Sequence, residues 1–522
     1  DAVKSISDFC IALGINIPTG KDSLSMKQKY QNDEVIAPGT VIISSIGNCT
    51  DINNIIEPVL KKDGGPIYYL NLSQDRFKLG GSAFAQTLNK IGQESPDIIS
   101  SEFLRKSFDG IQHLIKHKKI VAGHDISSGG LITTLLEMCF ADHKLGAKID
   151  LSDVGEHDTI KLLFSENAGV VFQMVDESAA VYLREQGISF YKIGSVINAP
   201  RLEINNGDYH HDFDIHHLRD VWYETSYLLD QKQSGEKLAL ERYQNYKEQP
   251  LNFNFPADFG GKRPKRNPEN KIKAAIIRDQ GSNSERELAN ALYLAGFEVK
   301  DVHMTDLISG RETLEDIHFL GAVGGFSNSD VLGSAKGWAG SFLYNDKAKK
   351  TLDNFFKRSD TLSIGICNGC QLFVELDLIN PELEKKGKML YNDSHKHESA
   401  FTSVQIQKNN SVMMSSLQGA NLGVWISHGE GKFHLPLSKD HYDIVAQYAY
   451  NAYPSNPNGS DYNTAMMCSP DGRHLVTMPH IERSIFPWHW AYYPDNRQDE
   501  VSPWIEAFNN AYSWLEKKLS DK

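Results

Sequence analysis

The chain is poor in cysteine. Cys10, Cys49, Cys139, Cys367, Cys370 and Cys468 are its 6 cysteines among 522 residues. Such sparse usage is typical of proteins from a reducing compartment, so we predict a cytoplasmic protein whose fold does not depend on disulfides. The chain also lacks any apolar run near the roughly 20 residues that a membrane-spanning helix needs. We therefore expect no membrane partner.

Positive charge is also in deficit, since the formal net charge is −13. A long-range negative field repels the phosphate backbone, which argues against a general nucleic-acid binder. Small anionic substrates remain compatible with this balance where local cations, backbone N–H groups or Mg²⁺ gather the negative charge.

Length and composition indicate a globular protein of several domains. The chain is 40% hydrophobic and 23% charged, which is ordinary usage. A chain of 522 residues is too long for one core. It opens with "DAVKSISDFCIALGI", which has the periodicity of an amphipathic helix from its first residues. We therefore expect the chain to be the rear part of a longer polypeptide.

The pattern of elements divides the chain into four segments. Residues 1–62 contain the first helix, "NIPTGKDSLSMKQKY" and a predicted strand "GTVIISSIGNC". Strands and helices alternate over 63–230, and residues 231–270 have the composition of a linker or a surface-hugging segment. A βαβ opening begins the segment 271–522. The predicted fold class is a multidomain combination of α/β and α+β architectures.

The stretch "IGICNGCQLF" contains Cys367 and Cys370 in a C-x-x-C spacing. This spacing occurs in zinc sites, redox pairs and catalytic thiolate sites. No second C-x-x-C or H-x-x-x-H lies near it, and the His-rich stretch 210–217 lies in another segment, which argues against zinc. The glycines flanking Cys367 form G-x-C-x-G, the pattern of a nucleophile elbow between a strand and a helix. We therefore interpret Cys367 as a nucleophile and Cys370 as a small apolar residue inside the helix.

A nucleophilic cysteine needs a base, and the late stretch "VTMPHIERSIF" offers one. Pro479 ends a predicted strand, and His480 and Glu482 follow as H-x-E. A histidine oriented by a carboxylate is the general arrangement of a catalytic triad. Because Cys367 and His480 are far apart in the sequence, the fold must bring them together.

Four motifs together resemble the triad glutamine amidotransferases, and more narrowly the large single-chain phosphoribosylformylglycinamidine synthases. They are "GICNGCQ", "SHGEGKF", "YPSNPNGS" and "MPHIERSIF". Upstream, "IPTGKDSLSMK" and "GHDISSGGLITTLLEMCFA" resemble the second half of that family's synthetase region, from the aminoimidazole-ribonucleotide-synthetase superfamily. The resemblance implies a C-terminal doubly wound α/β glutaminase domain. It is preceded by a synthetase C-terminal-like α+β domain and the remnant of its N-terminal partner.

The resemblance also implies roles for individual residues of the glutaminase domain. Cys367 attacks the side-chain amide of glutamine, His480 transfers the proton, and Glu482 orients His480. The backbone of Gly325 and Phe326 and the N–H of Asn368 are the expected oxyanion donors. The residues similar to those that line the family's glutamine pocket are Gln371, Ser427, His428 and Glu430.

In the synthetase region, "GKDS" places Lys21, Asp22 and Ser23 together, a set that suits a phosphate with Mg²⁺ or an ordinary turn. Asp125 at a strand end is a candidate Mg²⁺ ligand, and Gly129 and Gly130 at a helix start are candidate phosphate binders. The resemblance implies ATP or ADP and Mg²⁺ as cofactors, in a site that is either structural or catalytic.

The resulting hypothesis is the glutamine-hydrolysing part of an ATP-dependent ligase of de novo purine biosynthesis. That ligase converts formylglycinamide ribonucleotide, glutamine and ATP to formylglycinamidine ribonucleotide, glutamate, ADP and phosphate. Binding of formylglycinamide ribonucleotide needs the family's N-terminal part, which this sequence lacks and which we expect as a partner. The alternatives are a non-catalytic rear fragment for assembly or regulation, a different triad amidotransferase, and a C-x-x-C oxidoreductase.

Overall fold

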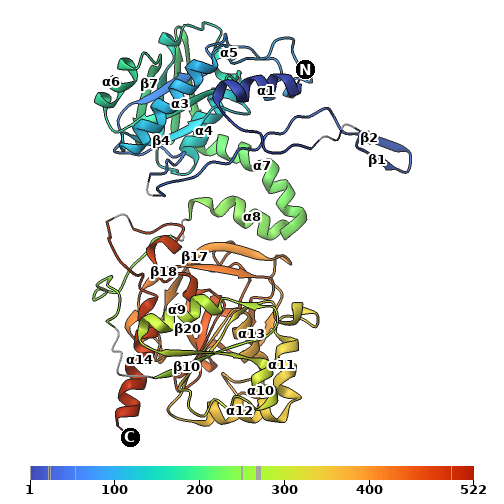
Figure 1. Cartoon of the computed structure of the whole chain (residues 1–522), viewed down its shortest axis with the longest axis vertical. Helices are drawn as coiled ribbons and strands as arrows, with labels where there is room; N and C mark the ends of the chain where they lie inside the picture. Colours follow the sequence, from blue (N-terminus) through green and yellow to red (C-terminus); the bar gives the residue numbers. More distant parts are fainter. Residues whose placement is uncertain are drawn as a thin grey trace. The chain divides into compact units, whose positions relative to one another are not determined.

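The computed structural model describes residues 2–21, 23, 25–52, 54–248, 251–265, 272–494 and 496–521. The chain forms two compact units, Asp1–Glu224 (unit 1) and Thr225–Lys522 (unit 2) (Figure 1). The predicted class is confirmed, because unit 1 is an α+β structure and unit 2 an α/β structure, each with its own mixed sheet.

Unit 1 is built on a seven-stranded sheet in the order β4-β6-β3-β7-β5-β8-β9. All pairs are antiparallel except β5 with β8. Helices α3 and α4 contact β4 (Figure 1). The elements are α1 (Ala2–Leu13), β1 (Lys27–Tyr30), β2 (Asp33–Ile36), β3 (Ile67–Asn71), α2 (Ala83–Thr87), α3 (Ser101–Lys116), β4 (Ile120–Asp125), α4 (Gly130–Phe140), β5 (Gly146–Asp150), α5 (Thr159–Phe164), β6 (Gly169–Met174), α6 (Ala180–Glu185), β7 (Tyr191–Ile197), β8 (Arg201–Asn206), β9 (Tyr209–Asp214) and α7 (Ile215–Ser234), whose last residues belong to unit 2.

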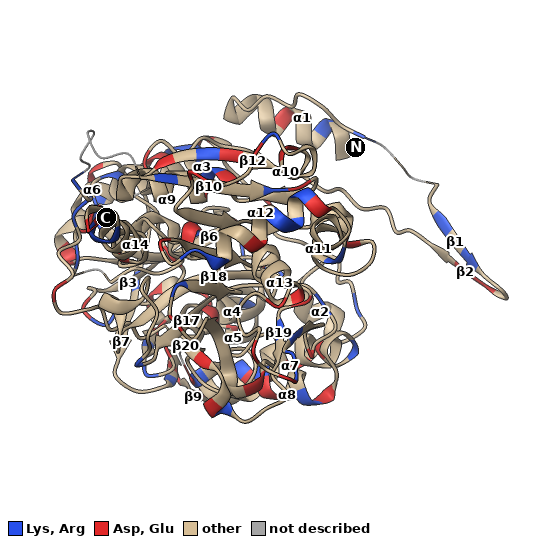
Figure 2. Ribbon diagram, turned by 90° about the horizontal axis from the view of Figure 1, so that it is seen from below, with Lys and Arg blue, Asp and Glu red and all other residues tan. Residues whose placement is uncertain are grey.

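The first part of unit 1 is exposed over most of its described residues, and Ile56 packs against the core of this unit. No described residue before Leu60 is buried. The predicted strand at 39–49 is wrong, since these residues have no regular structure and Ile42 and Ile46 are exposed. A strand needs a partner for its backbone and a surface for its apolar side chains, and the described residues of this segment meet neither. The hairpin β1–β2 forms nearer the N-terminus (Figure 2). The side chains of Lys27 and Glu34 form an ion pair there, with Nζ 3.1 Å from Oε1.

Unit 2 is built on a nine-stranded sheet in the order β12-β10-β13-β15-β22-β21-β20-β17-β18. The strands from β12 to β22 are parallel and the rest are antiparallel. The elements are α8 (Glu236–Gln244), β10 (Lys273–Arg278), β11 (Ser282–Asn283), α9 (Glu285–Ala295), β12 (Glu298–His303), α10 (Met304–Ser309), β13 (Phe319–Ala322), β14 (Gly324–Gly325), α11 (Lys336–Leu343), α12 (Asp346–Lys357), β15 (Leu362–Ile366), α13 (Asn368–Glu375), β16 (Lys388–Leu390), β17 (Glu398–Ile406), β18 (Asn421–His428), β19 (Lys432–His434), β20 (Asp443–Tyr448), β21 (Thr464–Cys468), β22 (His474–Thr477) and α14 (Ile505–Ser520).

The strand order places a functional edge in unit 2. The chain moves from β10 outward to β12 and then returns across β10 to β13, which is the reversal of a doubly wound sheet. In such sheets the carboxyl ends of the strands beside the reversal form the ligand-binding crevice. β13, β15 and β22 all end at this edge, because they pair in parallel.

The segment 231–270, predicted as a linker or a surface-hugging stretch, contains α8 and a short extended piece. Asn254 forms a β-bridge with Asn421, and Phe253 and Phe255 pack against the core of unit 2. Acidic and basic residues are scattered along the ribbon (Figure 2). Among the described residues, no helix has the length and apolarity needed to cross a membrane.

Candidate active site

Cys367 lies in a strained turn between β15 and α13. Its φ and ψ are 51° and −104°, a conformation that a non-glycine residue adopts only when its surroundings enforce it. A methyl group on Gly365 would lie 2.5 Å from the Gly369 carbonyl oxygen, and one on Gly369 would lie 2.1 Å from the Ala322 oxygen. Both glycines therefore permit close backbone approach, and the predicted strand, turn and helix are confirmed.

The two cysteines of the C-x-x-C pair occupy different environments. Both are free thiols, and Cys370 is fully buried in α13. Burial raises the pKa of the Cys370 thiol well above its usual value, which keeps it protonated and unreactive. The Cys367 Sγ instead lies 3.5 Å from the Ser427 carbonyl oxygen, to which its S–H donates. These environments fit one nucleophile with an inert neighbour.

His480 and Glu482 reach the same edge through the parallel pairing of β15 with β22. Ile366 is the register partner of Thr477, and the Cys367 N–H donates to the Thr477 carbonyl at 2.8 Å. His480 follows three residues after Thr477. A methyl group on Gly324, which follows β13, would lie 2.8 Å from His480 Cε1 and 3.5 Å from Cys367 Cβ. The ends of three strands thus bring the predicted nucleophile and base together.

The His480 side chain is held by its carboxylate. Nδ1 of His480 lies 2.6 Å from Glu482 Oε1, and the two residues are 2% and 1% exposed. Burial alone would lower the His480 pKa, but the Glu482 carboxylate and the Cys367 sulfur raise it to about 10. Such an imidazole holds a proton next to the sulfur, as a base that has accepted the thiol proton must do.

The predicted oxyanion donors lie beside Cys367. Gly325 has φ 115° in β14, and Asn368 is the first residue of α13. The Phe326 N–H, however, already donates to the Gly281 carbonyl at 3.0 Å, which leaves Gly325 and Asn368 as the candidates. The buried Asn368 side chain accepts from the Ser327 N–H at 3.3 Å and so fixes the loop after Gly325. The sequence did not predict this hydrogen bond, because a single asparagine amide belongs to no recognisable pattern.

Ser427 contacts the Cys367 sulfur, and Gln371 and Glu430 contact each other. Gln371 Nε2 donates to the Glu430 carbonyl at 2.8 Å, and Glu430 Oε1 accepts from the Ser334 N–H at 3.2 Å. Nearby, burial and the Glu430 charge raise the pKa of Asp330 above its usual value. Two acidic side chains at this place form an electronegative patch suited to an ammonium group. Asp330 escaped the sequence analysis because it belongs to none of the motifs.

His428 has a different environment from its predicted neighbours. It is buried, with Nδ1 3.2 Å from Asn392 Oδ1 and Nε2 3.5 Å from Asn458 Nδ2. Burial and the neighbouring His480 lower its pKa to about 3, so the ring is neutral. These contacts identify His428 as a residue that joins β18 to the loop of Asn458.

The predicted nucleotide residues of unit 1 do not assemble in the same way. Lys21 and Ser23 are exposed and hydrogen-bond to each other at 2.5 Å, and Asp22 lies outside the described residues. Asp125 ends β4 with an exposed carboxylate, 3.3 Å from His124 Nδ1. Among the described residues, no three His, Cys, Asp or Glu side chains are grouped as metal ligands.

Gly129 and Gly130 occupy the start of α4 as predicted, with φ of 92° and 75°. The Gly129 N–H is already satisfied, because it donates to Glu166 Oε1 at 2.9 Å. The same oxygen accepts from the Ala83 N–H at 2.7 Å. A phosphate at this helix start would have to displace the Glu166 carboxylate, so the described residues do not form a ready magnesium–phosphate cradle.

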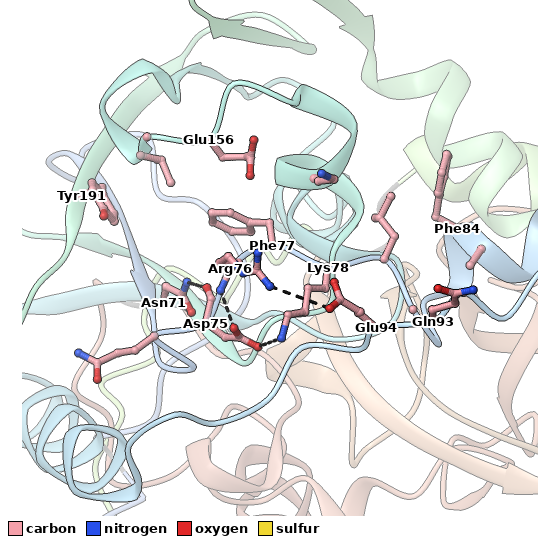
Figure 3. A pocket seen from close by; sticks show the side chains of 18 of the residues that line it. Asn71, Asp75, Arg76, Phe77, Lys78, Phe84, Gln93, Glu94, Glu156 and Tyr191 are labelled. Atoms are coloured by element: carbon pink, nitrogen blue, oxygen red, sulfur yellow. Dashed lines mark hydrogen bonds and ion pairs between the residues drawn. The ribbon is translucent and has the colours of Figure 1, made fainter.

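A separate cavity of about 930 Å³ lies in unit 1 beside β3 and α2. Two ion pairs lie among its lining side chains, as Figure 3 shows for Lys78 with Asp75 at 2.6 Å and Arg76 with Glu94 at 4.0 Å. The predicted residues Lys21, Ser23, Asp125, Gly129 and Gly130 are not among those that line it.

Three family models match successive parts of the chain. Residues 271–515 match the CobB/CobQ-like glutamine amidotransferase domain, residues 62–205 match the C-terminal domain of AIR synthase related proteins, and residues 1–48 match the FGAR-AT PurM_N-like domain. A solved structure of PurLQS from Thermotoga maritima aligns at 23% identity and a TM-score of 0.38, covering 47% of this chain and 100% of that one.

Similarity to curated proteins extends over nearly the whole chain. A probable phosphoribosylformylglycinamidine synthase of Arabidopsis thaliana, named as chloroplastic/mitochondrial, is 38% identical over 99% of this chain and 39% of its own length. The phosphoribosylformylglycinamidine synthase of Homo sapiens is 36% identical over 98% of this chain and 41% of its own length. The chain therefore spans about two fifths of these relatives. Over nearly its whole length the chain is therefore similar to about two fifths of these phosphoribosylformylglycinamidine synthases, and its residues 271–515 match a glutamine amidotransferase domain.

Proposed function

We propose that unit 2 hydrolyses glutamine through a thioester on Cys367. The observation that carries the proposal is the buried arrangement of Cys367, His480 and Glu482 at the carboxyl ends of β15 and β22. His480 takes the thiol proton, and the sulfur attacks the side-chain amide carbon of glutamine. The N–H groups of Gly325 and Asn368 face the developing oxyanion, and Glu482 keeps the imidazole oriented.

The remaining steps release ammonia and glutamate and restore the Cys367 thiol. The amide nitrogen takes the proton from His480 and leaves as ammonia. Water, deprotonated by His480, then attacks the thioester carbon and releases glutamate. Glu430 and Asp330 suit the α-ammonium of glutamine, because their carboxyl groups lie near enough for the Glu430 charge to raise the Asp330 pKa.

We further propose that the ammonia serves an ATP-dependent ligation of formylglycinamide ribonucleotide in purine biosynthesis. Similarity to phosphoribosylformylglycinamidine synthases supports this larger reaction, and the match of 62–205 to a synthetase-related domain supports a synthetase role for unit 1. The proposal also includes ATP or ADP and Mg²⁺ as cofactors. It further includes a partner that corresponds to the part of the relatives that this chain does not cover. The individual nucleotide residues, the segment boundaries and the cytoplasmic location stay predictions.

The test is intact-mass labelling with a chloroketone analogue of glutamine, followed by a glutamate-release assay. We expect one adduct on the parent chain and on Cys370→Ala, and none on Cys367→Ala. An adduct that requires both cysteines would favour the oxidoreductase alternative. A parent chain without any adduct would favour the non-catalytic alternative.

A further inference from the structure

A cluster of buried carboxylates and their half-buried cationic partners lies in unit 2 outside the amidotransferase motifs. The cluster comprises Asp230, Arg242, Lys396, Glu398 and Tyr453, and we call it the α7–α8 cluster. Asp230 lies in the last part of α7 and Arg242 in α8, while Glu398 begins β17 and Lys396 lies two residues before it. Asp230, Glu398 and Tyr453 are 6%, 7% and 3% exposed. Charges this deeply buried are costly unless they are fully paired, so their pairing is informative.

Asp230 is paired on three sides. Its carboxylate accepts from Ser234 Oγ at 2.6 Å, from Arg242 Nη1 at 3.0 Å and from Lys396 Nζ at 3.4 Å. Burial alone would raise the Asp230 pKa, but the hydrogen bond from Ser234 and the charges of Arg242 and Lys396 lower it below its usual value. Asp230 therefore stays ionised and ties two helices to the first residues of β17.

Arg242 extends the pairing to Tyr453. Its guanidinium lies 4.7 Å from the centre of the Tyr453 ring, contacts the Tyr453 hydroxyl, and lies 3.9 Å from Glu398. Tyr453 in turn donates from its hydroxyl to Glu398 at 3.1 Å and from its backbone N–H to Glu241 of α8 at 2.9 Å. Each polar group of Tyr453 thus contacts either α8 or β17.

The start of β17 is connected directly to the proposed glutamine pocket. Glu398 is the register partner of His428, and Ser399 is the partner of Ser427, in the pairing of β17 with β18. His397, next to Glu398, places Nε2 2.9 Å from Ser427 Oγ. The Ser427 carbonyl accepts from the Cys367 thiol at 3.5 Å.

A second connection runs through the loop that begins at Tyr453. Asn458 of this loop donates to the Tyr448 hydroxyl at 3.1 Å and approaches His428 Nε2 at 3.5 Å. Its carbonyl accepts from the Asp393 N–H at 3.2 Å, next to Asn392. Two independent routes therefore join the α7–α8 cluster to Ser427 and His428.

We propose that Asp230 and Arg242 are positioning residues of the glutamine pocket. They hold the start of β17 and the Tyr453 loop in place. These two segments in turn position the backbone of Ser427, whose carbonyl accepts from the Cys367 thiol. Neither residue lies within 271–515, the part that matches the amidotransferase domain, so the pocket depends on chain that precedes that domain. This inference rests on the proposed glutaminase function, because it concerns the geometry of the same site.

The test compares two alkylation rates of Cys367 in the full chain. The alkylation rate with a chloroketone analogue of glutamine depends on the glutamine pocket, whereas the rate with iodoacetamide depends on the thiol itself. In Arg242→Ala we expect the chloroketone rate to fall by about tenfold or more, because small misplacements in a binding site have large effects on rate. The iodoacetamide rate should change by less than about twofold. Arg242→Lys, which keeps the charge but not the forked geometry, should recover part of the chloroketone rate.

Arg358→Ala is the matched control. The Arg358–Asp360 pair has side-chain exposures of 26% and 9%, against 29% and 7% for Arg242 with Asp230. Arg358 precedes β15, at the opposite end of the strand from Cys367. Arg358→Ala should lower the unfolding midpoint about as much as Arg242→Ala while leaving the chloroketone rate unchanged. Equal loss of chloroketone rate in both variants, or no loss in Arg242→Ala, would overturn the proposal.

Hydrogen–deuterium exchange separates this inference from the proposed function. In Arg242→Ala, or in Asp230→Asn where that variant folds better, amides of 392–401 and 425–431 should exchange faster than in Arg358→Ala. If the parent chain gives no chloroketone adduct, faster exchange would support the positioning and contradict the glutaminase. Unchanged exchange in both segments would contradict the positioning whatever the labelling shows.

Discussion

The proposed active site of unit 2 and the predicted nucleotide site of unit 1 differ in how their residues are held. Cys367, His480 and Glu482 are 5%, 2% and 1% exposed and follow paired strands. Lys21 and Ser23 are exposed in a segment where no described residue is buried, and the Gly129 N–H is occupied by Glu166. A site built on strand ends is preorganised by the sheet, whereas exposed residues outside regular elements lack the support of a sheet.

The largest effect should come from the nucleophile. Cys367→Ala should lower glutamate release by about a thousandfold or more, because removing the nucleophile of a triad removes the covalent route. Cys370→Ala changes a buried residue of the same helix and should keep most of the activity. The measurement is glutamate release at saturating glutamine. Comparable losses in both variants would remove the distinction between the two cysteines.

Glu482→Gln should have the next largest effect, about a hundredfold or more on kcat, because the imidazole loses its orienting carboxylate. The His480 pKa, about 10 in the parent, should fall toward the ordinary value. Since the folded-state pKa is raised, the associated stability is fully present below about pH 6.5 and is lost as pH rises through about 10. The unfolding free energy of the parent should therefore decline more steeply over that range than that of Glu482→Gln. Denaturant titrations at several pH values check this, and parallel curves would contradict it.

Gly324→Ala should act on the geometry between the nucleophile and the base. The added methyl group would lie 2.8 Å from His480 Cε1, which forces the ring to shift. We expect kcat to fall by about ten- to a hundredfold with a smaller change in KM. Gly260→Ala is the control, since a methyl group there meets no atom within 4 Å. Unchanged kcat in Gly324→Ala would show that the ring tolerates displacement.

The smallest effect on activity should come from unit 1. Glu166→Ala leaves the N–H groups of Ala83 and Gly129 without their acceptor, which should lower the free energy of unfolding by about 1–3 kcal/mol. Glutaminase activity should be unchanged. Glu94→Ala, which removes an exposed carboxylate of the same unit, is the control for denaturant unfolding. A loss of glutaminase activity in Glu166→Ala would break the contrast between the units.

The sequence predicted the parts of the fold and site that depend on local pattern. The glycines around Cys367 indicated the turn, and Pro479 before His480 indicated a strand end at the same edge. Contacts between distant polar residues could not be predicted, since Asp230 and Lys396 have no shared motif. The strand predicted at 39–49 failed because apolar composition alone supplies no pairing partner.

The most direct test of the account is to trap the covalent intermediate. Rapid acid quenching of the parent chain with glutamine, followed by peptide mass spectrometry, should find a γ-glutamyl group on the peptide that contains Cys367, at the Sγ atom. Its amount should fall on dilution of glutamine and be absent in Cys367→Ala. Glutamate release without any such adduct, or an adduct on Cys370, would contradict the assignment of Cys367 as the nucleophile.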